Sequence, residues 1–277
     1  MTTTNGTAPR ALCRADADGR ITFELPGSAG ADPGARVLLR GRPAKGEAEP
    51  EEHALSLEPA GDGRLRAVLE PKPLLTEGRW DVLLVRAPGA EPERLRSGPR
   101  DLRALLDGHL REWPAPVAVR VPYATKDGHL ALRTWLRPAH AETDRVDVGE
   151  RTTTVTARLH GTEFTDDGLV RVRVRLRGGR GREVSVTPAV DADRRGFAFT
   201  VDHGELVGAE APDAPGYWDV YVLTEAGAAP VRAGRLLDDV ADRKHSFVHP
   251  TARVGGATVR PYYTVDNDLS FDVGPAR

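Results

Sequence analysis

The stretches GRWDVLLV at residues 78–85 and GYWDVYVL at residues 216–223 are two versions of one sequence, offset by 138 positions (78 to 216). A second pair, PYATKDGHL at 122–130 and PYYTVDNDL at 261–269, shares the pattern P-Y-x-T-x-D-x-x-L at an offset of 139 (122 to 261). A weaker match sets VLLRG at 37–41 beside VRLRG at 174–178. Matches at nearly one offset indicate an internal duplication, which constrains the fold more than any single motif does.

Both copies have the periodicity of β-structure. Apolar and polar residues alternate most clearly over 152–159 and 170–177, which places successive side chains on opposite faces of a strand. The two Trp-centred stretches are apolar enough to predict central strands. Further strands are expected at 21–25, 54–57, 64–69, 183–187 and 196–201, and Asp62-Gly63, Asp127-Gly128 and Asn267-Asp268 favour tight hairpin turns. The sequence therefore predicts an all-β chain of two tandem immunoglobulin-like antiparallel β-sandwich domains.

The domain limits follow from the repeat. We expect a polar N-terminal tail at residues 1–14, domain 1 at 15–143, a linker at 144–149 and domain 2 at 150–277. A chain of 277 residues suits two domains of about 100 to 150 residues each. Residues 99–113 carry leucines at helical spacing and predict one short helix.

Composition narrows the function classes. Cys13 is the only cysteine, which excludes an intrachain disulfide and any multi-cysteine metal site. A net charge of −2 gives no global argument for nucleic acid as the partner. No apolar run approaches the roughly 18 residues of a membrane span, and the first twenty residues lack the pattern of a secretory signal. We therefore expect a cytoplasmic protein, and its excess of arginine over lysine is typical of a GC-rich, actinobacterial genome.

The sharpest local signal is a run of alternating arginines, at Arg171, Arg173, Arg175 and Arg177. On a strand they project from one face at intervals of about 7 Å, a spacing that suits successive phosphates or carboxylates of a polyanion. Arg180 and Arg182 continue the run, whereas the first copy keeps only Arg36 and Arg40 nearby. The alternative reading is a solvated strand face whose arginines cover apolar surface and pair with neighbouring acids.

No residue is assigned a catalytic, cofactor-binding or metal-binding role, and no cofactor is expected. Trp80 and Trp218 are interpreted as core anchors rather than as sugar-stacking platforms. The acidic pairs at 16–18, 191–193 and 266–268 are interpreted as turn residues, and His245 and His249 as loop histidines. The chain contains no Gly-rich phosphate loop, nucleotide-binding pattern or serine elbow.

At its G-x-W-D-V strands and P-Y-x-T-x-D-x-x-L hairpins, the chain resembles the tandem immunoglobulin-like modules found C-terminal to bacterial cell-wall and teichoic-acid-type glycosyltransferases, especially actinobacterial ones. The resemblance spans most of both copies, and its motifs are structural. It implies modules that mediate oligomerisation or glycopolymer contact beside a separate α/β catalytic domain. This chain has no counterpart of that catalytic domain, so no active-site residue is carried over.

Three functions follow as hypotheses. The first is a non-catalytic protein that binds or scaffolds a glycosyltransferase, an anionic glycopolymer, or both. The alternative is a small-molecule biosynthetic enzyme, transferase-like, with a pocket between the two domains. The third is homo-oligomerisation through an exposed sheet edge or face. The sequence favours a binding protein over an enzyme.

Overall fold

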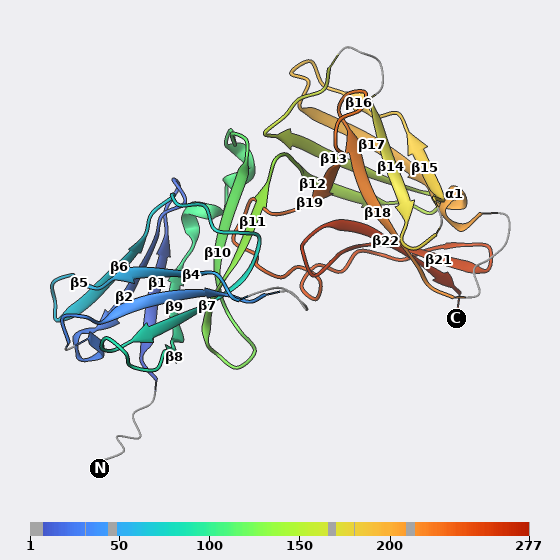
Figure 1. Ribbon diagram of the computed structural model, residues 1–277. Helices are drawn as coiled ribbons and strands as arrows, with labels where there is room; N and C mark the ends of the chain where they lie inside the picture. The colour runs from blue at the N-terminus through green and yellow to red at the C-terminus, as the bar shows by residue number, and fades with distance from the viewer. Residues whose placement is uncertain are drawn as a thin grey trace. The chain divides into compact units, whose positions relative to one another are not determined.

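The computed structural model describes residues 8–30, 32–43, 49–165, 170–179, 181–208 and 214–276. These residues are mostly in β-strands, and they divide into two compact units (Figure 1). Unit 1 comprises the residues through Gly108, Ala118–Leu136 and Leu237–Ala241, and unit 2 comprises His109–Val117, Arg137–Leu236 and Asp242–Arg277. The predicted all-β class is confirmed. No helix in the described ranges is long and apolar enough to cross a membrane.

Unit 1 packs two sheets against each other. The five-stranded sheet has the order β5-β6-β2-β1-β9, and the six-stranded sheet has the order β10-β11-β7-β3-β4 with β8 paired to β7. The strands of the first sheet are β1 (Arg10–Ala15), β2 (Ile21–Pro26), β5 (Glu58–Pro59), β6 (Arg64–Leu69) and β9 (Arg96–Asp101). Those of the second are β3 (Arg36–Gly41), β4 (Glu52–Ser56), β7 (Gly78–Val85), β8 (Glu93–Arg94), β10 (Val117–Ala124) and β11 (Leu130–Arg137).

Unit 2 repeats this arrangement with the two layers joined into one 11-stranded sheet. One layer has the order β16-β17-β13-β12, and the other contains β15-β14-β18-β22-β21-β20. The strands are β12 (His140–Val148), β13 (Thr152–His160), β14 (Arg171–Leu176), β15 (Glu183–Val186), β16 (Ala189–Val190), β17 (Gly196–Asp202), β18 (Gly216–Leu223), β19 (Val231–Gly234), β20 (Ala252–Val254), β21 (Ala257–Tyr263) and β22 (Leu269–Pro275). The one described α-helix, α1 (His203–Val207), follows β17.

One short segment in each unit connects the two layers. In unit 2, β19 pairs in parallel with β12 and antiparallel with β18. In unit 1, β8 pairs antiparallel with β7 and β9 pairs in parallel with β1, with the buried Leu95 between them. Among the described strands, each sandwich therefore combines antiparallel pairs with a parallel one, β1 with β9 in unit 1 and β12 with β19 in unit 2.

The duplication is visible in the strand registers. Trp80 lies opposite Leu132 of β11, and Trp218 lies opposite Phe271 of β22. In the P-Y-x-T hairpins, the Oγ1 of Thr125 accepts from the N–H of His129 at 3.0 Å, and that of Thr264 from the N–H of Asp268 at 3.2 Å. The shared threonine thus closes the same turn in both copies, which explains why the pattern is repeated.

The third sequence match is wrong by two positions. Arg40 lies opposite Asp81, and Arg175 lies opposite Asp219, so Arg40 corresponds to Arg175 and not to Arg177. A shift of two keeps every side chain on its face of the strand. For that reason the alternating pattern alone did not reveal the error.

The structure also moves the domain limits. Residues 144–149, expected to form a linker, lie mostly in β12, which pairs with β13 and β19. At the N-terminus, β1 begins at Arg10, inside the expected tail. The helix expected at 99–113 is replaced by the end of β9 and two 3-10 segments, Arg103–Leu105 and Gly108–Leu110. Gly108 packs against the backbone of Leu237, an approach that leaves no room for a side chain at this position.

Candidate functional site: the arginine-rich face of unit 2

Strand β14 presents three arginines on the outer face of its layer. Val172 and Val174 are fully buried in the core of unit 2, so Arg171, Arg173 and Arg175 point the other way. We call these three residues the β14 ladder. They lie opposite Leu223, Tyr221 and Asp219 of β18, respectively.

The ladder is weakly paired. Arg171 donates from Nη1 to the carbonyl of Val170 at 2.9 Å. Arg173, with a side chain that is 45% exposed, lies 3.7 Å from the Oε1 of Glu183, a separation too long for a strong hydrogen bond. Arg175 is exposed and has no ion pair with any described residue. Most of the guanidinium donors of the ladder therefore face solvent and are available to a ligand.

Arg177 has a different role from the ladder. It lies in the turn after β14, and its Nη2 and Nε donate to the two carboxylate oxygens of Asp219 at 2.6 and 3.2 Å. This hydrogen bonding raises the pKa of Arg177. Arg182 is also committed, because it lies over the Trp218 ring and donates to the carbonyls of Leu206 and Val207. Arg180 lies outside the described residues.

Asp219 is the centre of a polar network that the sequence analysis missed. Besides Arg177, it accepts from Arg232 at 3.2 Å and from the hydroxyl of Ser270 at 2.8 Å. Burial opposes ionisation, but the hydrogen bond from Arg177 and the charge of Arg232 hold the pKa of Asp219 below its usual value. Arg232 also lies 4.7 Å over the ring of Tyr221, beside the ladder.

Unit 1 has the same network. Asp81 accepts from Arg42 at 2.5 and 3.1 Å and from Arg94 at 3.0 Å. Asp81 and Asp219 both follow the repeated tryptophan, so the Trp-Asp echo in the sequence was the available signal. Repetition in both copies indicates a structural role for this network, in which a carboxylate ties the turn after one strand to two others.

Next to this network, the two units have different residues on the outer face of the sheet. The positions that correspond to Arg173, Tyr221 and Leu223 are Leu38, Leu83 and Val85, which form a buried apolar cluster on the outer face of unit 1. Arg40, which corresponds to Arg175, is paired with Glu52 at 2.6 Å. The arginine-rich face is therefore a property of unit 2 and not of the repeated fold.

The remaining sequence interpretations can be placed. Trp80 and Trp218 are each 1% exposed, which confirms them as core residues. The carboxylates of Asp16 and Asp193 accept from nearby backbone N–H groups, as turn residues do. Asp268 instead forms ion pairs with Arg137 at 2.7 Å and Arg232 at 3.4 Å. His245 and His249 lie in a loop, as expected.

Cys13, the one cysteine of the sequence, is buried. Burial raises the pKa of the Cys13 thiol to about 12, so the group is neither accessible nor ionised near neutral pH. Within the described ranges no group of three or more His, Cys, Asp or Glu side chains has the arrangement of a metal site. Among the described residues, the arginine-rich face of unit 2 is the best-defined candidate site, and exposed guanidinium groups are hydrogen-bond donors that suit an anionic ligand.

No protein-family model and no curated protein matches the chain. Among solved structures, S. aureus TarS residues 217–571 matches at 15% identity and a TM-score of 0.30, over 71% of this chain and 56% of that one. A longer structure of S. aureus TarS gives 15% and 0.28, over 78% and 39%, and a marsupial T cell receptor gives 6% and 0.28, over 97% and 92%. The chain spans little more than half of TarS 217–571. Likenesses at this level carry no functional assignment.

Proposed function

We propose that this chain is a non-catalytic binding protein that holds an anionic polymer, such as an anionic glycopolymer, on the β14 ladder of unit 2. The observation that carries the proposal is three arginines on one strand face, with few internal partners, at spacings of about 7 Å. Such a row matches a ligand with repeated charges better than it matches a single small anion. A glycosyltransferase as a protein partner is part of the same proposal and rests on the family resemblance alone.

The difference between the two units supports this assignment. A solvated strand face would be expected to pair its arginines with acids, as Arg40 pairs with Glu52 in unit 1. Arg175 has no such pair among the described residues, and Arg173 takes the place of the buried Leu38. With an exposed arginine where unit 1 has a buried leucine, unit 2 buries less apolar surface at this position. A contact with a ligand would account for an arginine here.

The test is binding to dextran sulfate, with neutral dextran as the matched uncharged polymer. We expect the chain to bind dextran sulfate and not dextran, with an affinity that falls as salt rises. The variant R171S/R173S/R175S should bind at least about tenfold more weakly, since each exposed charge contact contributes roughly 0.5–1 kcal/mol. The logarithmic dependence of affinity on salt should also become less steep, by about one for each arginine that no longer meets a charge on the polymer.

Unit 1 provides the control. R36S/R40S removes the same charge as R171S/R175S from the corresponding positions of the other copy. The proposal requires R171S/R175S to weaken binding and R36S/R40S to leave it nearly unchanged. Equal weakening in both double variants would mean that net charge alone drives binding, and unchanged binding by the triple variant would exclude the ladder as the site.

A further inference from the structure

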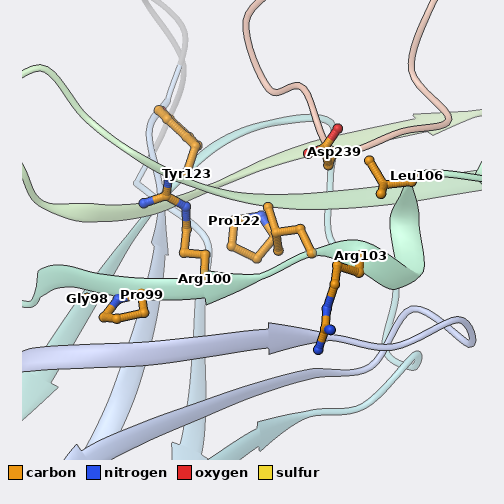
Figure 2. Close-up of a pocket in the computed structure, with 9 residues that line it drawn as sticks. Gly98, Pro99, Arg100, Arg103, Leu106, Pro122, Tyr123 and Asp239 are labelled. Atoms are coloured by element: carbon orange, nitrogen blue, oxygen red, sulfur yellow. The ribbon is translucent and has the colours of Figure 1, made fainter.

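Unit 1 contains a hollow between the edges of its two sheets. It has a volume of about 410 Å³ and lies where β9 and β10 run past each other (Figure 2). Its walls come from β9, the 3-10 segment that follows, β10 and the loop around Asp239, which belongs to unit 1. Pro99 and Pro122 lie on the two strands and have no N–H to offer, which keeps these edges from pairing with other strands. The hollow is large enough for a small organic ligand.

Only one of its two arginines is free to bind a ligand. Arg103 donates from Nε and Nη2 to both carboxylate oxygens of Asp101, each at 2.8 Å. Arg100 uses Nη1 to reach the hydroxyl of Ser97 at 2.7 Å, and the rest of its guanidinium has no bond to any described residue. Figure 2 shows the two side chains extending in opposite directions, with Arg100 reaching toward Tyr123. Arg100 can therefore present several N–H donors to an anion in the hollow.

The opposite charge is supplied by Asp239. This carboxylate is half-buried and forms no hydrogen bond or ion pair with the described residues. In Figure 2, Arg100 comes from β9 and Asp239 from a loop, and Pro122 is drawn between the two side chains. A half-buried carboxylate with no partner among the described residues can accept charge-assisted hydrogen bonds from a cation at this position.

The surface between the two charges is apolar. Pro99, Leu102, Leu106 and Pro122 line the hollow, and Leu106 remains 50% exposed. An exposed leucine and two prolines suit the side chains or the hydrocarbon part of a ligand.

We infer that this hollow binds a small zwitterion of the size of a dipeptide, with its carboxylate on Arg100, its ammonium on Asp239 and its apolar side chains on the proline and leucine surface. This binding is independent of the anionic polymer proposed for unit 2. Three features of one hollow support it: a guanidinium with spare donors, a carboxylate without a partner, and an apolar surface between them.

The experiment is a titration of the isotopically labelled full chain, followed by backbone amide shifts, with three probes that differ only at their ends. These are Leu-Phe, its N-acetyl derivative without the ammonium, and its C-terminal amide without the carboxylate. We expect shifts around residues 98–106, 122–123 and 239, with Leu-Phe binding about fivefold or more tightly than either derivative because each removes one charge-assisted contact.

Two variants assign the ends of the ligand. R100Q should abolish the preference for Leu-Phe over its amide and keep the preference over the acetylated form, and D239N should do the reverse. R103Q is the matched control, because Arg103 is hydrogen-bonded to Asp101 and extends in the direction opposite to Arg100. The R103Q variant should retain both preferences. The inference is wrong if all three probes bind equally, if none shifts these amides at millimolar concentration, or if R103Q behaves like R100Q.

Discussion

His160 makes the stability of unit 2 dependent on pH in mild acid. Its side chain, at the end of β13, is 3% exposed, and its Nε2 has no hydrogen-bond partner among the described residues. Burial, together with the charges of His140, Arg158 and Arg195, lowers the pKa of His160 from 6.5 to about 4, although Glu142 opposes the shift. The folded chain therefore keeps this ring neutral where the unfolded chain protonates it.

The linkage between protonation and folding gives the direction and the magnitude of the effect of His160 on stability. Between pH 6.5 and 4 the unfolded state binds more protons, so the stability contributed by His160 is present above pH 6.5 and is lost as the pH falls toward 4. Each pKa unit corresponds to 1.36 kcal/mol, which gives about 3 kcal/mol for the whole shift and about 2 kcal/mol between pH 7 and pH 5.

The assay is hydrogen exchange of peptides from β12 and β13, corrected for the intrinsic effect of pH on exchange. Peptides from β2 and β6 report on unit 1 in the same sample. We expect the free energy of opening in β13 to fall between pH 7 and pH 5, and H160Q to reduce that fall by about 2 kcal/mol. If the fall were the same in H160Q as in the parent chain, the reasoning from the burial of His160 would be refuted.

Two further predictions concern the core and the repeated network. Cys13 should react with a thiol reagent at pH 8 only as fast as unit 1 unfolds, because the thiol is buried and its pKa is raised to about 12; rapid labelling of the folded chain would contradict this. D219N should destabilise unit 2 by about 1–2 kcal/mol, because it removes the carboxylate charge to which Arg177 and Arg232 donate. D81N should destabilise unit 1 by a similar amount, because Arg42 and Arg94 donate to Asp81. Urea unfolding of the two variants measures both effects, and a difference confined to one unit would show that the two networks are not equivalent.

The sequence predicted the strands whose alternation reflects a half-buried sheet. Arg64–Leu69 was placed with its observed limits, and 152–159 and 170–177 differ from β13 and β14 by one residue at the ends. The central position of the Trp-centred strands was also predicted, because a strand covered on both faces needs apolar residues on both, as in β7.

For other elements, the sequence pattern did not indicate the observed structure. Only the first four residues of β12 are buried, and its more exposed remainder is mostly polar, so residues 144–149 were interpreted as a linker. The leucines at 102, 105 and 106 have helical spacing, but the segment forms 3-10 turns and its Gly108 packs against Leu237, a long-range contact that local spacing could not indicate. β1 was placed in the tail because its buried residues, Ala11, Cys13 and Ala15, are all small and give only a weak apolar alternation.

The candidate site was predicted in part. The position of Arg171, Arg173 and Arg175 on one strand face followed from the alternation with Val172 and Val174. The different role of Arg177 did not, because its partner Asp219 lies on another strand 42 positions away. Asp239 could not have been associated with Arg100 by any pattern, since a loop brings them together from distant parts of the chain. Anion binding by the ladder remains a prediction.

The connecting strand β19 has a mechanical consequence. Since it bonds to β12 on one side and β18 on the other, the two layers of unit 2 belong to a single hydrogen-bonded network. A force that separates the two layers of unit 2 must break the hydrogen bonds that β19 makes to β12 or to β18. Unit 2 should therefore extend in one abrupt step under tension rather than by gradual separation of its sheets.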